Sequence, residues 1–433
     1  MEISREGISS TELQEFGDER FIKIPIQSYL RLIDIEPVPP QIALINAVNS
    51  PDYRFIVAAL NRRTGKSFIS NVIGHLVTLI PGCNILIISP NYSLSSISWD
   101  IQRHLISSFN IETARSNAKD KIIELENGST IRMGSVSQAD SVVGRSYDLI
   151  IYDEAALNDD GEETFNIQLR PTLDKPNSKA IFISTPRGKN WFYRFYERGK
   201  QKDNRDYDRW ISIKSTYNDN PRASLEDIDD ARATMSKAQF AQEYECDFVA
   251  LEGQIYELNK QNIIEIDPTM IDQFDVIAGL DMGFRDPTAF VVMISDGVNY
   301  YIVDEFQTNE KSTSIYAEMI QEKIAFWHID FIYIDSAHAQ TKFDLAYEYD
   351  ITCTNAKKSI LDGIGYIASL VDHDRIFIDK KCDTVIKMFE TYRWDDKVGL
   401  QNERPKHDEA SHMADALRYA IYTHSYNITG IGE

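Results

Sequence analysis

The amino-acid sequence predicts an α/β protein of two domains, each built around its own sheet. Over the first 250 residues, short apolar runs alternate with longer amphipathic segments. This order is typical of a mainly parallel sheet with crossover helices. A second series of strands, which includes a hairpin, starts near residue 276. With 433 residues and 43% hydrophobic content, the chain can bury two cores.

The domain boundaries are predicted from a break in this pattern, where Gly253 and Pro268 interrupt it. We expect a first domain over residues 1–250 with a helical subdomain at about 219–250, a linker over 251–267 and a second domain over 268–433.

Composition narrows the class of protein. The net charge of −22 argues against a protein that coats nucleic acid by bulk electrostatics, although local contacts stay open. The four cysteines show no Cys-x-x-Cys spacing and are typical of buried thiols in a reducing compartment. The N-terminus has no apolar core for export, and no run of about 18 apolar residues occurs. We therefore expect a soluble, cytosolic protein without a membrane segment.

The first functional motif follows a strand predicted at 55–59. Leu60 stands where a phosphate-binding loop usually begins with glycine, and the loop ends in Gly65-Lys66-Ser67 before a helix. Backbone N–H groups and a helix N-terminus would surround a polyphosphate, with Lys66 along the β- and γ-phosphates and Ser67 on Mg²⁺. The expected nucleotide-binding residues of the loop are Arg62, Arg63, Thr64, Gly65, Lys66 and Ser67. The alternative is a basic strand-to-helix turn.

The second motif is an apolar strand at 148–152 that ends in Asp153-Glu154. Open α/β sheets bind ligands at this end of their strands. Asp153 would hold Mg²⁺, and Glu154 would orient and deprotonate the water that attacks the γ-phosphate. An acidic pair there is otherwise a solvated turn or a helix N-cap. Its order after the Lys66-Ser67 loop favours ATP hydrolysis.

Other elements of the first domain are strands at 84–90 and 179–186, a helix at 94–109 and a hairpin over 122–133 that turns at Asn127-Gly128. The segment 187–209 interleaves basic and aromatic residues. Two interpretations stay open for it. It is either a DNA-facing segment or an amphipathic helix whose cations lie over a core stripe.

In the second domain, aspartates are predicted near the ends of two strands and on one helix. Strands at 276–283 and 331–337 place Asp281 and Asp335 near their ends, and a helix at 407–422 presents Asp408, His412 and Asp415 on one face. A ribonuclease H-like sheet builds a two-metal site in this way, because clustered carboxylates repel one another unless divalent cations bind them. The alternative is a set of ordinary strand and helix caps.

With these motifs the chain resembles the large subunit of tailed-bacteriophage terminases, the motor and nuclease that packages viral DNA. The resemblance covers most of the chain and rests on Gln41, the arginine-bearing loop, Gly144-Arg145, Asp153-Glu154, Ser184-Thr185-Pro186, Asp281-Met-Gly283, Asp335 and the run from His412 to Tyr419. It implies an N-terminal P-loop ATPase with a mainly parallel sheet, followed by a ribonuclease H-like α/β nuclease domain.

The resemblance also assigns residue roles. It implies that Gln41 contacts adenine, and that Ser184 and Thr185 couple hydrolysis to movement. Arg145 matches the arginine finger that reaches the ATP of a neighbouring subunit, with Arg62 as the competing residue. The implied nuclease metal ligands are Asp281, Asp335 and Asp415, with Glu305 and Asp408 as auxiliary candidates. His412 departs from relatives that carry a carboxylate there, which leaves the ligands of the second metal open.

The family further implies ATP with Mg²⁺ in the motor and two Mg²⁺ or Mn²⁺ in the nuclease. Its partners are double-stranded DNA, a portal protein, a small terminase subunit and the procapsid. A ring, expected to be a pentamer, would form on the portal, and the chain alone would be a monomer. The expected location is the cytoplasm of the infected bacterial host and transiently the procapsid portal, not the mature virion.

Two rival functions stay open. A DNA helicase or repair translocase with an attached nuclease domain would use the same ATPase motifs, but it gives no reason for the aspartate set. A non-catalytic capsid or DNA-binding component would not need the intact loop and acidic strand end.

Overall fold

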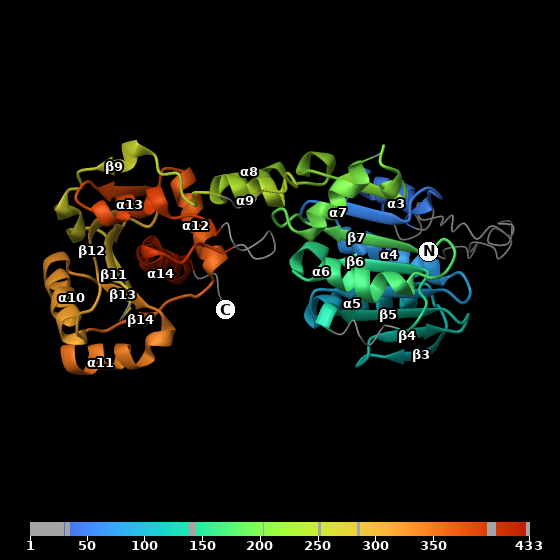
Figure 1. Ribbon diagram of the computed structural model, residues 1–433, viewed down its shortest axis with the longest axis horizontal. Coiled ribbons are helices and arrows are strands. Elements are labelled where there is room, and N and C mark those ends of the chain that lie inside the picture. The colour runs from blue at the N-terminus through green and yellow to red at the C-terminus, as the bar shows by residue number, and fades with distance from the viewer. Residues whose placement is uncertain are drawn as a thin grey trace, which may run out of the picture. The chain divides into compact units, whose positions relative to one another are not determined.

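The computed structural model of the protein describes residues 30, 35–137, 144–201, 203–249, 253–283, 286–395 and 404–429 (Figure 1). The chain forms two compact units. Unit one comprises Met1–Leu225 and Ala241–Val249, and unit two comprises Glu226–Phe240 and Ala250–Glu433. Residues 226–240 thus group with unit two, whereas we expected a helical subdomain at 219–250 within the first domain. The domain boundaries stay a prediction.

The described residues of unit one form a sheet of eight strands in the order β3-β4-β5-β2-β6-β7-β1-β8. Its pairs from β5 to β8 are parallel, whereas β3, β4 and β5 pair antiparallel. The mainly parallel sheet that the sequence predicts is therefore confirmed. The strands are β1 (Phe55–Ala59), β2 (Asn84–Ser89), β3 (Thr113–Asn117), β4 (Ile122–Leu125), β5 (Thr130–Ser135), β6 (Leu149–Asp153), β7 (Lys179–Ser184) and β8 (Trp210–Lys214). The hairpin of β4 and β5 turns at Gly128, whose φ of 82° favours glycine.

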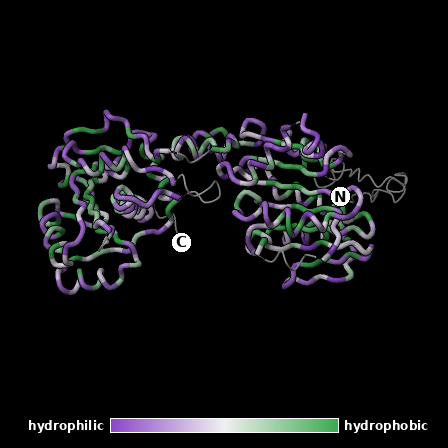
Figure 2. Tube along the Cα trace, in the orientation of Figure 1, coloured by the Kyte–Doolittle hydropathy of each residue, from purple (hydrophilic) through white to green (hydrophobic). Residues whose placement is uncertain are grey.

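Helices cover both faces of this sheet because successive side chains of a buried strand point to opposite sides. The alternate β1 residues Ile56 and Ala58 pack in one cluster with α4, whereas Phe55 and Val57 pack in the other with α7. Figure 2 shows hydrophobic residues along these strands. The helices of unit one are α3 (Pro39–Asn49), α4 (Lys66–Thr78), α5 (Tyr92–Ser108), the short α6 (Gly161–Glu163) and α7 (Trp191–Lys200).

Helix α7 answers the question left open for the segment 187–209. Its aromatic residues Trp191, Phe192 and Phe195 are fully buried. Arg194 and Arg198 both form ion pairs with Glu162, at 2.5 and 2.7 Å. The aromatic stripe is therefore part of the core, and two of the cations are held by the protein itself, as the amphipathic-helix interpretation predicts.

In unit two, the part of the chain that the structure describes forms a seven-stranded mixed sheet in the order β14-β13-β10-β11-β12-β15-β9. The strands β10, β11 and β12 are antiparallel, and β13 and β15 join them in parallel on either side. The strands are β9 (Ile263–Ile264), β10 (Asp275–Asp281), β11 (Thr288–Ser295), β12 (Tyr300–Thr308), β13 (Phe331–Ile334), β14 (Thr354–Asn355) and β15 (Ile376–Asp379). The helices are α8 (Leu225–Thr234), α9 (Lys237–Glu243), α10 (Thr313–Trp327), α11 (Ala339–Tyr349), α12 (Ile360–Asp372), α13 (Asp383–Thr391) and α14 (Glu409–Thr429), of which α8 and α9 extend over the boundaries with unit one.

Close backbone contact holds α14 on β10. A Cβ atom on Gly279 would lie 1.8 Å from the carbonyl oxygen of Ala416, so only glycine allows this approach. The helix starts two residues later than predicted and extends to Thr429. Among the described helices, none is both long and apolar enough to cross a membrane.

Candidate active sites

Hydrogen bonds within the loop and to β7 hold the loop between β1 and α4. Thr64 Oγ1 donates a hydrogen bond to the Asn61 carbonyl at 2.8 Å, and the Leu60 N–H donates to the Ser184 carbonyl at 3.0 Å. Gly65, the N-cap of α4, has a φ of 72°, which a side chain would strain. Helix α4 therefore begins directly after this loop, and a helix N-terminus in such a place is typical of an anion site.

Gln41, the residue matched to adenine binding, contacts this loop directly. Its Nε2 donates to the Thr64 carbonyl at 2.8 Å, and its Oε1 accepts the Val38 N–H at 3.1 Å. A Cβ atom on Gly65 would lie 2.9 Å from the same Nε2. The side chain is buried and positions the loop, and adenine contact stays a prediction.

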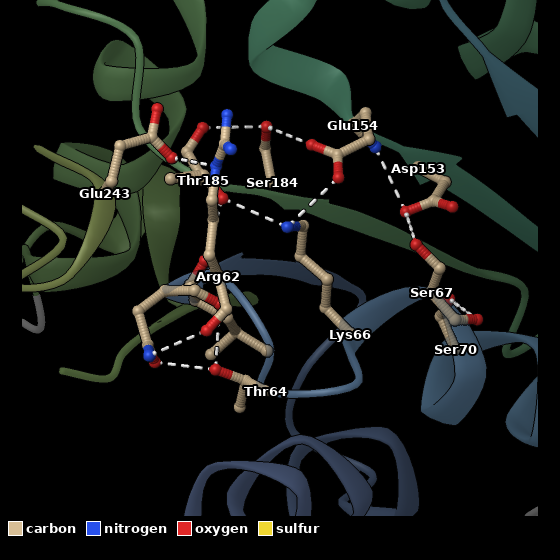
Figure 3. Close-up of polar contacts among 12 residues, drawn as sticks. Arg62, Thr64, Lys66, Ser67, Ser70, Asp153, Glu154, Ser184, Thr185 and Glu243 are labelled. Atoms are coloured by element: carbon tan, nitrogen blue, oxygen red, sulfur yellow. Dashed lines mark hydrogen bonds and ion pairs between the residues drawn. The ribbon is translucent and has the colours of Figure 1, made fainter. Parts of the chain in front are cut away.

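The predicted lysine and acidic pair come together (Figure 3). Lys66 Nζ lies 3.0 Å from Glu154 Oε1 and 3.0 Å from the Thr185 hydroxyl. The Ser184 hydroxyl donates to Glu154 Oε2 at 3.4 Å. Strand order explains this meeting, because β7 lies between β1 and β6, and all three parallel strands end at the same edge of the sheet.

Asp153 and Ser67 form a second contact in the same place. The Ser67 hydroxyl donates to Asp153 Oδ1 at 3.2 Å. Burial raises the pKa of Asp153 to about 6, and Glu154 adds to the increase, while Ser67 and Lys66 oppose it. A bound cation would keep this buried carboxylate charged. A hydroxyl and a carboxylate are oxygen ligands of the kind that Mg²⁺ prefers, so the residues present fit that ion.

Glu154 has an unusual backbone conformation. Its φ of 49° and ψ of 43° lie in the left-handed region, which non-glycine residues rarely adopt. Such conformations cost about 1–3 kcal/mol and cluster at active sites. Here the conformation follows the end of β6 directly and points the carboxylate toward Lys66.

Sequence reasoning missed the partner of Arg62. Glu243, whose side chain is only 7% exposed, accepts from Arg62 Nε at 2.5 Å and pairs with Arg187 Nη1 at 2.8 Å. The Arg62 N–H also donates to the Glu243 carbonyl at 3.1 Å. No motif marks a glutamate so far along the chain from the loop. The features that identify Glu243 are its burial and its contacts with two arginines, and these are visible only in the structure.

Arg145, the predicted arginine finger, is exposed and lies before the first residue of β6. Asp153 and Glu154 lie at the other end of that strand, and the five residues of β6 span about 17 Å. Arg145 therefore does not join the polar cluster around Lys66 of its own chain. Gly144, with a φ of 87°, supplies the turn before it.

In unit two, Asp281 and Asp335 are brought to neighbouring positions. Leu280 of β10 pairs in register with Ile334 of β13, so the residues that follow, Asp281 and Asp335, leave adjacent parallel strands at the same edge. The third aspartate, Asp415, lies on α14. Burial raises the pKa of Tyr419, and the carboxylates of Asp415, Asp281 and Asp335 add to the increase.

Each of these aspartates has a basic partner. Asp281 Oδ2 lies 3.0 Å from His412 Nδ1, Asp335 Oδ1 lies 3.0 Å from Lys358 Nζ, and Asp415 Oδ1 accepts from Arg418 at 2.7 Å. Burial raises the pKa of Asp281, and the hydrogen bond to Asp281 raises the pKa of His412. Carboxylates at one sheet edge, each needing positive charge, are a donor set that fits hard divalent cations.

The described residues hold one close ligand group, and it differs from the predicted one. Asp286, His407 and His412 each offer an atom within 4.8 Å of the other two. The three predicted aspartates do not form such a group among the described residues. Sequence reasoning missed Asp286 and His407, although His407 lies five residues before His412 and Asp286 five residues after Asp281.

The two auxiliary candidates have structural partners. Glu305 accepts the backbone N–H groups of Thr384 and Val385 at 2.6 and 2.7 Å and so caps the start of α13. Asp408 accepts the Ala410 N–H at 3.2 Å, at the start of α14, and lies 3.3 Å from Lys406. These contacts account for both residues without a metal.

Comparison with known proteins gives matches over both units. The family model described as "Terminase large subunit, T4likevirus-type, N-terminal" matches residues 62–263, and that described as "Terminase RNaseH-like domain" matches residues 278–423. The terminase large subunit of Escherichia phage T5 is 45% identical over 440 residues, which cover 98% of this chain and 99% of the relative. That of Thermus phage G20c is 25% identical over 194 residues, covering 40% of this chain and 39% of the relative.

Solved structures support the fold. The large terminase of the thermophilic bacteriophage D6E has a TM-score of 0.66 at 18% identity, covering 91% of this chain and all of that one. The same protein in complex with ADP has a TM-score of 0.64 at 19% identity, covering 92% of this chain and 100% of that one.

Proposed function

Because this chain belongs to the family of phage terminase large subunits, in which an ATPase is joined to a ribonuclease H-like nuclease, we propose a role for each polar group at its two sites. The chain is an ATPase and a metal-dependent DNA endonuclease of viral genome packaging. The observation that carries the residue assignments is the contact of Lys66 with Glu154 and Thr185, at 3.0 Å each, across three strand ends of one sheet.

In the motor, ATP would place its phosphates at the N-terminus of α4, where Lys66 supplies positive charge. Ser67 and Asp153 would hold Mg²⁺, which neutralises charge on the phosphates when bound. Glu154 would orient the attacking water and accept its proton. Since Lys66 pairs with Glu154 before the nucleotide arrives, phosphate binding would release the carboxylate for this task. Ser184 and Thr185 contact Glu154 and Lys66, so they are placed to transmit the change.

We assign the arginine finger to Arg145 acting on a neighbouring subunit. Its exposure, and its place at the far end of β6 from Glu154, support a role in trans. Arg62, the competing residue, is held by Glu243 within its own chain. Charge from such a finger stabilises the transferring phosphoryl group and needs an assembled ring.

In the nuclease, Asp281, Asp335 and Asp415 would bind the divalent ions that clamp the attacking water and the leaving oxygen of a phosphodiester. The register of β10 and β13, which brings Asp281 and Asp335 to one edge of the sheet, supports the first two members of this set. The solved structure of the phage D6E large terminase with ADP, and the nuclease requirement for divalent metal in this fold, support ATP with Mg²⁺ for the motor and Mg²⁺ or Mn²⁺ for cleavage.

The remaining proposals concern partners and place. The substrate is concatemeric double-stranded DNA, which the motor moves into the procapsid. The partners are the portal protein, the small terminase subunit and further copies of this chain in a ring of about five subunits. The protein acts in the cytoplasm of the infected host and at the portal, and leaves before the virion matures.

One experiment tests these assignments together. The purified chain is incubated with plasmid in Mg²⁺ and in Mn²⁺, and phosphate release from ATP is measured alongside. Glu154→Gln should abolish ATP turnover and keep cleavage, whereas Asp281→Ala should abolish cleavage and keep turnover. His104→Gln, an exposed change on α5, serves as the control for both. Wild-type cleavage by folded Asp281→Ala, or wild-type turnover by Glu154→Gln, would overturn the assignment concerned.

A further inference from the structure

The strongest unassigned feature of the molecule is the group of two imidazoles and a carboxylate beside the nuclease aspartates. We propose that Asp286, His407 and His412 bind one divalent transition-metal ion of the Zn²⁺ class and discriminate against Mg²⁺. These three side chains would supply the protein ligands of the ion, and Asp281 would orient one of them. For its effect on DNA cleavage the site rests on the proposed nuclease function.

The three ligand atoms already lie close together. They are within 4.8 Å of one another, and the rings of His407 and His412 have centroids 5.2 Å apart at an interplanar angle of 71°. Ligands of one Zn²⁺ ion lie about 2.0–2.2 Å from the metal, so only a small closure is needed. His412 is buried on α14, whereas Asp286 and His407 are exposed. An ion can therefore enter from solvent.

Hydrogen bonds orient both imidazoles for this task. His412 Nδ1 lies 3.0 Å from Asp281 Oδ2, and His407 Nδ1 lies 3.1 Å from the Ser411 hydroxyl. Each ring thus uses Nδ1 within the protein and keeps Nε2 for a ligand. A carboxylate or hydroxyl that holds the second nitrogen of a histidine is the usual support of a protein metal site, since it fixes the tautomer and the ring orientation.

The backbone is also built to bring Asp286 to this place. After β10 the chain turns back at Gly283, where a Cβ atom would lie 2.2 Å from the Asp286 carbonyl oxygen. The Gly283 N–H donates to Thr288 Oγ1 at 3.1 Å, and that hydroxyl donates to the Gly283 carbonyl at 2.9 Å. This closed turn returns Asp286 toward the edge that carries Asp281.

The donor types decide which metal the site takes. Mg²⁺ is a hard ion that prefers oxygen ligands and keeps much of its water, so two imidazole nitrogens favour it little. Imidazole suits first-row transition metals, and two histidines with one carboxylate, leaving positions open to water, are a common set for them. Asp281 would link this ion to the nuclease centre, because it orients His412 while it remains a predicted ligand there.

The test uses Co²⁺ as a spectroscopic probe on the full-length chain. Nitrogen-bound Co²⁺ of low coordination number absorbs visible light much more strongly than six-coordinate Co²⁺ with oxygen ligands alone. We expect strong bands that saturate at one ion per chain, that Zn²⁺ removes and that excess Mg²⁺ does not. His407→Gln and Asp286→Asn should each weaken Co²⁺ binding at least tenfold, and Asp281→Asn, which removes an orienting group, by about 10- to 100-fold.

Two controls separate this site from its surroundings. His104→Gln and Asp335→Asn should keep the bands, since neither residue belongs to the proposed ligand set. Unchanged bands in His407→Gln, confirmed in Asp286→Asn, would overturn the proposal, as would full displacement of Co²⁺ by Mg²⁺. Plasmid cleavage by the same samples tests the nuclease assignment separately. Wild-type cleavage by Asp335→Asn would contradict the nuclease assignment, and the Co²⁺ bands would still report on the metal site.

Discussion

The pairing of Arg62 with Glu243 gives the sharpest prediction for the motor. Glu243 is buried and accepts from Arg62 at 2.5 Å and from Arg187 at 2.8 Å. Replacing it with glutamine keeps the shape and removes the charge. An NH₂ group replaces one carboxylate oxygen and faces an arginine N–H. Because both groups are donors, one charge-assisted hydrogen bond is lost.

The geometry sets the size of two opposite effects. A hydrogen bond to a charged group is worth about 1.5–3 kcal/mol, so Glu243→Gln should lower the free energy of unfolding of unit one by about 2 kcal/mol. For a unit of this size, that loss corresponds to a decrease in Tm of about 4–8 °C. The Arg62 side chain is 55% exposed, so its own pair is worth at most about 1 kcal/mol. Freed from it, Arg62 should reach the phosphates more easily and tighten ATP binding up to about fivefold.

Thermal unfolding and titration with a fluorescent ATP analogue measure the two effects on the same protein. Glu245→Gln, two residues further along, is the matched control and should change neither. Arg62→Ala should remove the gain in affinity when it is combined with Glu243→Gln. Weaker ATP binding in Glu243→Gln, equal to that of Arg62→Ala, would refute the reasoning, because Glu243 would then present Arg62 to the nucleotide instead of withholding it.

Two further predictions concern assembly and pH. Mixing Arg145→Ala with Glu154→Gln subunits should restore ATP hydrolysis, since one subunit can supply the arginine finger and the other the catalytic carboxylate. An arginine finger raises the rate by about 10³–10⁵. Absence of rescue in rings shown to contain both variants would contradict a role in trans. Burial lowers the pKa of His75 to about 4, against a hydrogen bond to the Gln102 side chain that raises it. The ordinary pKa of histidine is 6.5, so at a pH below this value His75 binds a proton in the unfolded chain but not in the folded chain. Unit one should therefore lose about 2 kcal/mol of its free energy of unfolding from this group between pH 7 and pH 5. His75→Gln should flatten that slope in denaturant unfolding, whereas the exposed change His104→Gln should not.

Short sequence patterns predicted the structural elements that depend on residues close together in the chain. The strand-loop-helix of Lys66 and the strand that ends in Asp153 were confirmed because apolar runs, a left-handed glycine and strand-end carboxylates depend on neighbours in sequence. The antiparallel β4–β5 hairpin was confirmed for the same reason, since Asn127-Gly128 sets its turn. The assignment of function to these residues relies on chemistry, and it stays a proposal for each one.

What the sequence could not predict depends on contacts made over long separations. Strand β8 pairs with β1 at the sheet edge, but its residues follow a basic segment that masks the strand pattern. Glu243 meets Arg62 only because the end of α9 returns to the loop. Asp286 meets the two histidines only because Gly283 closes a turn and α14 packs on β10. In each case tertiary packing decides which polar groups meet.

The partners of the three predicted nuclease aspartates also indicate which of these carboxylates a metal ion would reach most easily. Arg418, which holds Asp415, is 4% exposed, and His412, which holds Asp281, is 9% exposed, so neither can move away without leaving a buried charge. Lys358, which holds Asp335, is 56% exposed and can turn into solvent at little cost. A cation that enters this edge would therefore displace Lys358 from Asp335 first. The other two aspartates would keep their protein partners and offer only their remaining oxygens, so we expect the first ion to bind beside Asp335.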